Sequence, residues 1–247
     1  MKNTLNTEAL VAWFGQARAA HLRREKAVEG FYLSHPRVVF LKTLKADANV
    51  LDVGAGDGSL EVFRNWLEPP RPDLKMYAYS LEKGNRFDAY AGYELGNWED
   101  GPPVFAGVTL DAIIACHFIE HVSNPLTFLD WAAGRLAPGG RIYVEWPSPD
   151  SLRLPSRKEL LARGVDIIIS NFHDDCTHRQ LPDLTELLSS LKSTGWLIDQ
   201  QGVVKSPYYE EELLASCDVP PADASAKLSA FWSKTRWAQF FIATKED

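Results

Sequence analysis

A glycine-rich turn is the first feature of this sequence whose residue types and spacing could hold a ligand. Gly54, Gly56 and Gly58 lie in the stretch VLDVGAGDGSL, directly after a short apolar run and directly before a helical pattern. Glycine adopts positive φ angles and lets a ligand approach the backbone, and the N-terminus of the following helix offers unpaired amides to a negative or polar group. Such turns also join strands to helices without any ligand, so the glycines alone do not establish a function.

Two residues beside the turn narrow the chemistry. The spacing is GxGxG, and Ser59 stands where a dinucleotide fingerprint has its third glycine. Asp52 lies two positions before the first glycine, at the end of the apolar run. A carboxylate there would repel a pyrophosphate, whereas it suits a ligand that carries an ammonium group. The pattern therefore disfavours a dehydrogenase.

Histidines in two short stretches could supply a general base, because imidazole titrates near neutral pH. His117 and His121 lie in the stretch HFIEH together with Glu120, and His173 and His178 lie in the stretch NFHDDCTHR. Glu120 and His121 also have a structural interpretation, in which they cap and brace the turn that follows a strand.

The elements that must position these residues alternate between strand-like and helix-like segments in the first half of the chain. This alternation is typical of a parallel sheet covered by helices. The sequence predicts strands over residues 49–53, 75–80, 92–95, 110–116, 141–146, 196–205 and 236–244. Helices are predicted within residues 6–44, over 58–66, from Pro125 to before Pro138, and over about 181–193. Residues 147–180 show little periodicity, and the last two strands are predicted to pair as an antiparallel edge.

The composition is that of an ordinary globular protein. The 247 residues carry a net charge of −7, and 45% of them are hydrophobic, which excludes disorder as the dominant state. No apolar run approaches the roughly 18 residues of a membrane span, and we expect no signal peptide. Cys116, Cys176 and Cys217 have no CxxC spacing, which argues against a disulfide framework or a thiolate zinc site. The acidic charge disfavours non-specific nucleic-acid binding, and we expect a cytoplasmic protein.

Three stretches of the sequence resemble the class I S-adenosylmethionine-dependent methyltransferases, and together they cover about residues 45–200. LDVGAGDG resembles the first motif of that family. Residues 109–149 are similar to its fourth strand, helix and fifth strand, with the run "EHV…P…L…R.L.PGG". Residues 175–196 are similar to the "TH…L..LL…GW" segment of one large subgroup.

The resemblance implies an α/β fold, namely a Rossmann-like, seven-stranded and mostly parallel sheet with helices on both faces. It divides the chain into a helical extension over residues 1–44 and an S-adenosylmethionine-binding domain over residues 45–247. Residues 147–180 and 205–235 would then be insertions on the substrate side.

The same resemblance implies a set of cofactor-binding residues. Gly54, Ala55 and Gly56 would line the methionine part of S-adenosylmethionine, and Asp52 would hold the glycine loop and help receive the amino group. An acidic side chain after the second strand usually binds the ribose hydroxyls, because a carboxylate accepts two hydroxyl donors at once.

In this chain Ser80 occupies the usual ribose position, and Glu82 follows after Leu81. We expect Glu82 to bind the ribose, with Ser80 and Leu81 beside it. Near the adenine, the amide oxygen of Asn97 would accept from the exocyclic amine and Trp98 would pack on the ring, although core packing is an equal interpretation of Trp98.

The end of the fourth strand is the next expected part of the site, since ligands gather at the carboxyl ends of strands in open α/β sheets. Cys116 and His117 fall at this position. The EHV motif occurs in relatives with different chemistries, which favours the structural interpretation of Glu120 and His121. In the catalytic interpretation, His121 or His178 is the general base, with His117 as a further candidate.

A metal-assisted reaction on an RNA or sugar hydroxyl is an alternative, because HxxEH resembles the ExxEH metal motif of small-RNA and ubiquinone-pathway methyltransferases. His117 replaces the first glutamate of that motif, and His178 with Asp174 and Asp175 could complete the site. The main prediction assigns no metal.

The predicted activity is transfer of a methyl group from S-adenosylmethionine to a small-molecule acceptor, at oxygen, and not to nucleic acid. A binding module without catalysis is the other alternative. Aromatic residues outside the common core are predicted to line an acceptor pocket with apolar walls. They are Trp13, Phe14, Phe31, Tyr32, Tyr208, Tyr209, Phe231 and Trp232.

Overall fold

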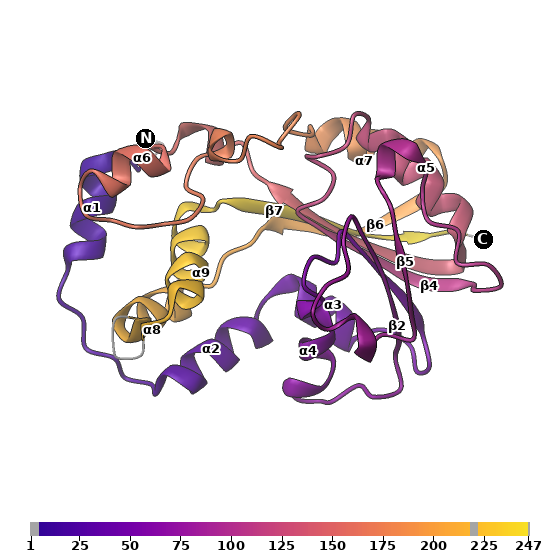
Figure 1. Cartoon of the computed structure of the whole chain (residues 1–247), viewed down its shortest axis with the longest axis horizontal. Helices are drawn as coiled ribbons and strands as arrows, with labels where there is room; N and C mark the ends of the chain where they lie inside the picture. The colour runs from indigo at the N-terminus through magenta and orange to yellow at the C-terminus, as the bar shows by residue number, and fades with distance from the viewer. Residues whose placement is uncertain (1–4, 218–221, 247) are drawn as a thin grey trace. The chain divides into compact units, whose positions relative to one another are not determined.

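The computed structural model describes residues 5–217 and 222–246, and these residues form two compact units (Figure 1). The first unit consists of residues 1–35, 147–178 and 203–239. The second consists of residues 36–146, 179–202 and 240–247. Residues 218–221 of the predicted 205–235 insertion, and the start of the predicted N-terminal extension, lie outside the described residues.

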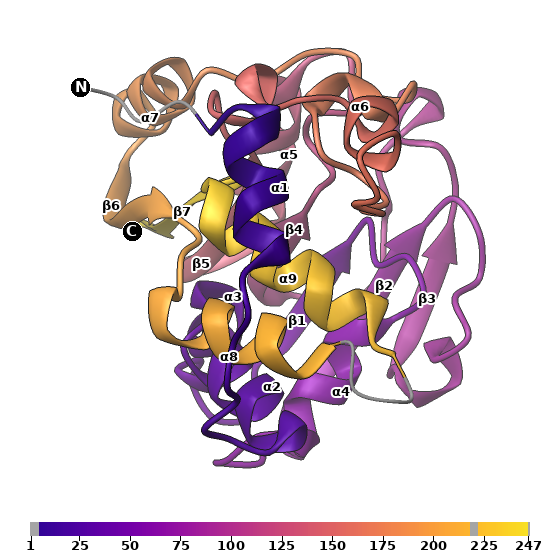
Figure 2. The same cartoon turned by 90° about the vertical axis from the view of Figure 1, so that its left-hand side faces the viewer.

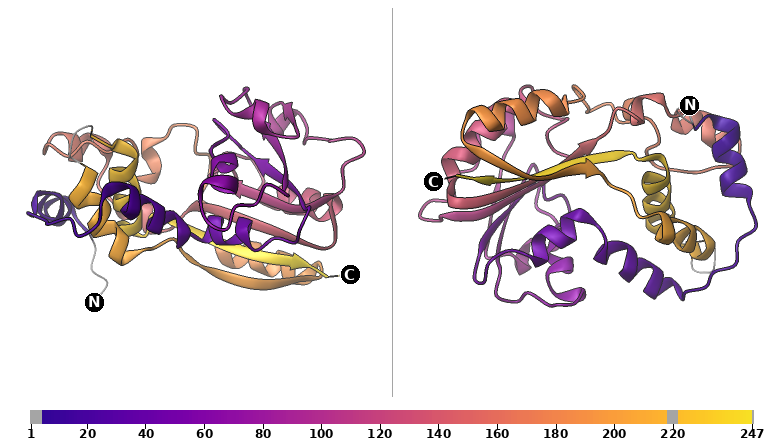
Figure 3. Two further views of the ribbon diagram at one scale, coloured as in Figure 1. Left: turned by 90° about the horizontal axis from the view of Figure 1, so that it is seen from below. Right: turned by 180° about the vertical axis from the view of Figure 1, so that it is seen from behind.

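A seven-stranded sheet has the order β3-β2-β1-β4-β5-β7-β6. Its strands are β1 Asn49–Val53, β2 Lys75–Ser80, β3 Gly92–Leu95, β4 Leu110–Cys116, β5 Leu136–Pro147, β6 Trp196–Val203 and β7 Ala238–Lys245. β1 pairs in parallel with β2 and β4, and the pairs β2–β3 and β4–β5 are also parallel. The predicted Rossmann-like, mostly parallel sheet is confirmed, and β6 and β7 are neighbours at one end of it (Figure 3).

Helices cover both faces of this sheet in the second unit, as the sequence predicts. α5 Pro125–Arg135 and α7 Leu184–Ser193 pack together on one face, while α3 Pro36–Lys42 and α4 Ser59–Trp66 lie on the other (Figure 1). Two short 3-10 turns, η1 Phe87–Ala89 and η2 Trp98–Asp100, follow β2 and β3. β1 and β4 are buried because helices cover both of their sides, so most residues of both strands are apolar.

The register of the strands brings their carboxyl ends into line. Val53 at the end of β1 lies beside Tyr79 of β2 and Ala115 of β4. Cys116 at the end of β4 lies beside Glu145 of β5. Residues that follow these strands therefore meet at one edge of the sheet, where the predicted site residues are found.

Element boundaries differ from the predictions where glycine and proline act locally. β5 begins at Leu136, five residues earlier than predicted, because the Pro138-Gly139-Gly140 segment forms an irregularity inside the strand. Gly139 adopts a φ of +69° there, which a glycine tolerates at no steric cost. α7 begins at Leu184 rather than 181, because the side chain of Asp183 caps it by accepting from the backbone of Glu186.

The first unit is mainly helical. It contains α1 Thr7–Gly15, α2 Arg24–Leu33, η3 Ser151–Arg153, α6 Arg157–Leu161, η4 Phe172–Asp174, α8 Pro207–Cys217 and α9 Ala224–Thr235. α8 and α9 lie side by side (Figure 2), and α2 packs on α8. In the described part of the chain, no helix is both long and apolar enough to cross a membrane.

The apolar core of this unit corrects the prediction of an aromatic acceptor pocket. Trp13 and Phe31 belong to a buried cluster with residues of α8 and α9, and Phe231 is fully buried. These three side chains pack the unit rather than line a cavity. Trp232 stacks on Trp237 with their ring centroids 4.3 Å apart, while Tyr208 remains 60% exposed.

Candidate functional site

The glycine loop between β1 and α4 has the backbone that its sequence predicts. Gly54, Gly56 and Gly58 have φ angles of +74°, +55° and +83°, a region that other L-residues seldom adopt. The amides of Gly54 and Ala55 both donate to the carbonyl oxygen of Tyr79 on β2, at 2.9 and 3.1 Å. A Cβ atom added to Gly56 would meet nothing within 4 Å, so the backbone there borders open space that a ligand can fill.

Asp52 lies beneath this loop at the end of β1 and is only 5% exposed. Its Oδ2 accepts a hydrogen bond of 2.8 Å from the hydroxyl of Tyr90. Burial raises the pKa of Asp52 to about 6, although the Tyr90 hydrogen bond and the charge of Arg37 oppose the rise. A buried carboxylate beside a glycine loop with open space fits an ammonium group, as predicted for the amino group of the cofactor.

Arg37 of α3 is a site residue that the sequence analysis missed. Its charge lowers the pKa of Asp52 and also opposes the rise in the pKa of the Cys116 thiol. Its guanidinium also lies 5.5 Å from the ring centroid of Phe63 on α4. The guanidinium therefore lies beside the carboxyl ends of β1 and β4, where a cation suits a carboxylate of a ligand. One arginine near the start of a short helix gives no sequence signal for this role.

Cys116 and His117 end β4, as predicted, but their protonation states limit their chemistry. Burial raises the pKa of the Cys116 thiol well above its usual range, so the sulfur is protonated and unreactive. The ring of His117 lies between two buried carboxylates, 3.1 Å from Glu145 and 3.4 Å from Glu120. Burial disfavours the charged imidazole, but the two carboxylates together raise its pKa to about 9.

His117 is therefore protonated near neutral pH and cannot act there as a general base. Its φ of +52° is unusual for a residue with a side chain. Its amide donates to the carbonyl oxygen of Glu145 at 2.8 Å, and the Glu145 carboxylate also accepts from the hydroxyl of Tyr143. These contacts favour a structural role in which His117 fixes the turn after β4.

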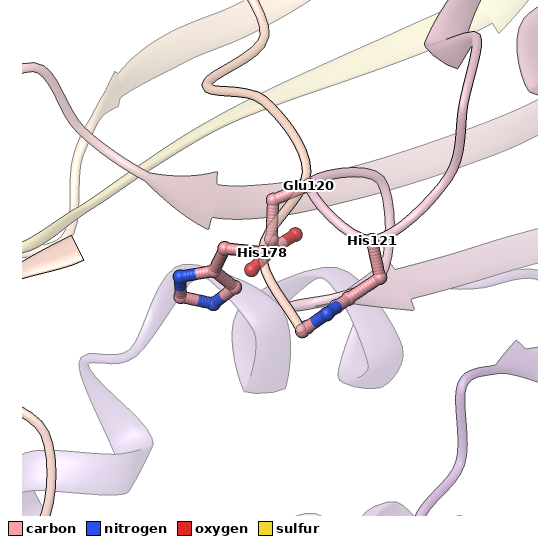
Figure 4. A group of neighbouring side chains, drawn as sticks. All are labelled: Glu120, His121 and His178. Atoms are coloured by element: carbon pink, nitrogen blue, oxygen red, sulfur yellow. The ribbon is translucent and has the colours of Figure 1, made fainter. Parts of the chain in front are cut away.

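Glu120 and His121 lie on the same turn, and Figure 4 draws them with His178. Glu120 is fully buried, and among the described residues neither of its carboxylate oxygens has a hydrogen-bond partner of good geometry. Its backbone carbonyl accepts from the amide of Arg179 at 2.9 Å. Glu120, His121 and His178 all carry side-chain atoms of the kind that bind metal ions.

His178 is the last residue of its segment in the first unit, one peptide bond before Arg179. Its Nδ1 lies 2.6 Å from the carbonyl oxygen of Phe172, and its ring stacks on that of Phe172 with centroids 4.5 Å apart. Because a carbonyl oxygen can only accept, Nδ1 carries a proton, and Nε2 lies 3.9 Å from Oδ2 of Asp175. A general base acting through Nε2 requires a ring that is protonated at Nδ1 in this way.

The residues predicted for the ribose and adenine lie after β2 and β3. Glu82 is exposed after Ser80, and Leu81 is 70% exposed, as an apolar contact for a ligand would be. The Asn97 side-chain oxygen accepts from the amide of Glu99 at 3.1 Å, which leaves one lone pair for another donor.

Trp98 is half-buried and packs edge-on against three aromatic rings. The rings are those of Phe118, Phe128 and Trp131, with centroids 5.2–5.6 Å away. This packing supports the core interpretation of Trp98.

Most of the chain matches a known protein family. The family model described as "Methyltransferase domain" matches residues 23–201. No protein of curated function matches the sequence. Among solved structures, a SAM-dependent methyltransferase from Archaeoglobus fulgidus is 15% identical, with a TM-score of 0.51, and the match covers 90% of this chain and 94% of that one.

Two further structures have the same likeness. The plantazolicin methyltransferase BpumL, solved with a triazolic desmethylPZN analog and SAH, is 15% identical with a TM-score of 0.51, and the match covers 90% of this chain and 91% of that one. The [4+2]-cyclase SpnF is 16% identical with a TM-score of 0.51, and the match covers 93% and 84%. At these identities the structures show the fold alone, and the cyclase illustrates that one fold serves different reactions.

Proposed function

Because the chain belongs to the methyltransferase-domain family, as a class I S-adenosylmethionine-dependent enzyme, we propose that it methylates a hydroxyl group of a small molecule. The observation that carries the cofactor half of this proposal is the glycine loop, with open space at Gly56 and the buried carboxylate of Asp52 beneath it. The net charge of −7 supports an acceptor other than nucleic acid. The structure of the plantazolicin methyltransferase BpumL with a triazolic analog is consistent with an organic acceptor.

In this proposal the residues around the loop bind the two charged groups of the methionine part. Asp52 accepts from the ammonium group, and Arg37 holds the carboxylate. Gly54, Ala55 and Gly56 let the backbone approach the methionine chain, because no Cβ atom of Gly54 or Gly56 stands in its way. S-adenosylmethionine, when bound, supplies an electrophilic methyl group on a sulfonium.

The ribose and adenine occupy the ends of β2 and β3 in the same proposal. Glu82 accepts from the ribose hydroxyls beside Ser80, Leu81 covers the adenine ring, and the Asn97 oxygen accepts from its amine. The segments 147–180 and 205–235 supply the acceptor side.

A hydroxyl acceptor needs a base near the methyl group, since the nucleophile must lose its proton. His178 is the preferred candidate, because the contact of its Nδ1 with Phe172 leaves Nε2 as the acceptor nitrogen of the neutral ring. His121 is the second candidate. His117, protonated between Glu120 and Glu145, positions the turn instead.

A metal-assisted reaction is a second candidate function, and the carboxylate of Glu120 is the observation that favours it. This carboxylate is fully buried, and it has lone pairs beyond its 3.4 Å contact with His117 that a bound cation would contact. With a histidine nitrogen from His121, the donor set would favour zinc, iron or nickel over magnesium.

The test is calorimetric titration of the purified protein with S-adenosylmethionine, S-adenosylhomocysteine and NAD in parallel. Binding of the first two alone is expected, and binding of NAD alone, or of none of them, would contradict the proposal. Acceptors with phenolic and aliphatic hydroxyls are then incubated with isotopically labelled S-adenosylmethionine, with and without a chelator. Loss of turnover with the chelator, together with stoichiometric metal in the purified protein, would favour the metal-assisted reaction.

A further inference from the structure

A second segment of the chain, which we call the covering segment (residues 84–90), packs on the glycine loop. The backbone amide of Arg86 donates to the carbonyl oxygen of Asp57 at 3.1 Å, and the side chains of these residues form an ion pair at 2.5 Å. The covering segment follows β2 and includes η1, whose Phe87 is 1% exposed. It therefore touches the glycine loop through both backbone and side-chain contacts.

The closest approach between these two segments is at Gly84. A Cβ atom on this residue would lie 2.3 Å from the carbonyl oxygen of Gly56 and 2.7 Å from the backbone carbon of Asp57, distances that real contacts do not reach. A side chain at position 84 would displace the glycine loop. The conformation of the glycine loop therefore depends on the close packing of Gly84, which belongs to a different segment of the chain.

The covering segment ends at Tyr90, whose hydroxyl contacts Asp52. Tyr90 is 7% exposed and donates the 2.8 Å hydrogen bond to Oδ2 of Asp52. This bond stabilises the ionised carboxylate, because a carboxylate accepts hydrogen bonds more strongly than a neutral carboxyl oxygen does. It also fixes the orientation of the carboxylate, since Oδ2 is held by Tyr90.

We propose that Tyr90 is a positioning residue for cofactor binding, which keeps Asp52 ionised and aimed at the ammonium group and so sets the lower pH limit of binding. This inference rests on the proposed role of Asp52. Burial raises the pKa of Asp52 to about 6, and the hydrogen bond from Tyr90 opposes that rise. Without the hydroxyl, protonation of Asp52 extends to higher pH.

Several other charged or titratable groups act on this hydrogen bond, and none of them replaces it. Arg37 of α3 favours the ionised form of Asp52, and Asp57 of the glycine loop opposes it. Asp52 in turn raises the pKa of Cys116 on β4. Burial and the Asp52 carboxylate raise the pKa of Tyr90, so the hydroxyl keeps its proton to donate, while Glu61 of α4 acts on it in both directions, through a backbone hydrogen bond that lowers the pKa and a charge that raises it. Tyr90 is the group among them that hydrogen-bonds Asp52 directly.

The experiment measures the dissociation constant of S-adenosylhomocysteine, which retains the ammonium group, from pH 5 to pH 8.5 by calorimetry. In the wild type we expect affinity to fall as the pH drops through about 6. Tyr90→Phe should move this midpoint upward by about one pH unit, so that affinity is about fivefold weaker than wild type at pH 6 and little changed at pH 8. Tyr93→Phe, the same chemical change on β3, serves as the control and should keep the wild-type midpoint.

Asp52→Asn separates the failure of this inference from the failure of the proposed function. If Asp52→Asn removes the pH step but Tyr90→Phe leaves the midpoint at the wild-type value, the role of Tyr90 is refuted and that of Asp52 stands. If Asp52→Asn binds as tightly as the wild type with the same pH step, the role of Asp52 in the proposed function is wrong. If Tyr90→Phe melts too early for titration at 25 °C, the same titration at a lower temperature gives its midpoint, while Gly84→Ala tests the packing of the covering segment.

Gly84→Ala should weaken binding about tenfold or more at every pH without moving the midpoint, because it displaces the loop but leaves the Tyr90 hydroxyl in place. Unchanged affinity in this variant would contradict the inferred packing of the covering segment on the loop.

Discussion

Replacing Asp52 by asparagine should make the protein more stable while weakening its hold on the cofactor. A carboxyl whose pKa rises from 3.8 to about 6 on folding costs about 3 kcal/mol of stability at pH 8, since each pKa unit corresponds to about 1.4 kcal/mol. The cost is present above the unfolded value of 3.8 and grows until the pH passes the folded value. Asparagine removes this cost, and its oxygen can still accept from Tyr90. The amide hydrogens of asparagine are buried without a hydrogen-bond acceptor, which destabilises the folded state. We therefore expect a net stabilisation of about 1–2 kcal/mol at pH 8.

The free-energy cost of burying the asparagine amide does not depend on pH, so the pH dependence of the stabilisation by Asp52→Asn comes from the wild-type carboxyl alone. At pH 5 the wild-type carboxyl is mostly protonated in the folded state, and its cost falls to about 1.6 kcal/mol. The stabilisation by Asp52→Asn should therefore be about 1.4 kcal/mol smaller at pH 5 than at pH 8. Scanning calorimetry without cofactor would measure it, at about 2–4 °C in melting temperature per kcal/mol.

Asp57→Asn is the matched control for this substitution, because Asp57 is exposed on the same loop and pairs with Arg86 at the surface. This control should change stability by at most about 1 kcal/mol, by a similar amount at both pH values. An Asp52→Asn variant that is equally stabilised at pH 5 and pH 8, or destabilised at pH 8, would refute the account of Asp52 as a strained buried carboxylate.

Three further substitutions probe the other parts of the site. Gly56→Val should abolish S-adenosylhomocysteine binding by calorimetry while the protein keeps its circular dichroism spectrum, whereas Gly107→Val, at an equally open position with a φ of +76°, should bind normally; binding by the first variant would mean that the loop is misassigned. Arg37→Gln should weaken S-adenosylhomocysteine binding about tenfold or more but leave adenosine binding unchanged, and an equal loss for both ligands would contradict its contact with the carboxylate. His178→Ala and His121→Ala should each be assayed for turnover and for cofactor affinity; the base should lose turnover about 100-fold or more with unchanged affinity, and full turnover in both would return both residues to structural roles.

The sequence predicted most of the sheet because its central strands are buried on both faces. Apolar runs such as residues 49–53 and 110–116 have no other stable position in a globular protein, and glycines mark where the first of them ends. The position of Asp52 relative to Gly54 then followed from the spacing alone. Local breaks are harder to predict, because Pro138 and Gly139 are typical of the segment after a helix, yet both lie within β5.

The residues that the sequence did not reveal reach the site from other segments of the chain. Arg37 precedes the glycine loop on a short helix, and Tyr90 follows it on an irregular segment. Neither residue is therefore part of a sequence motif that includes Asp52. The protonation state of His117 likewise depends on Glu145, which lies on the neighbouring strand. The prediction that Trp13 and Phe31 line an acceptor pocket is wrong, because an apolar side chain suits a buried core as well as the wall of a pocket.

The position of β7 in the sheet has a consequence for how the chain is completed during synthesis. β7 spans Ala238–Lys245 yet lies between β5 and β6 rather than at an edge. β6 therefore lacks the strand it pairs with until residues 238–245 have left the ribosome, and pairings between distant segments are slow to form. A chain cut before residue 238 would lose an interior strand and leave β5 and β6 with unpaired backbone edges. We expect such a fragment to aggregate, since exposed strand edges template intermolecular pairing.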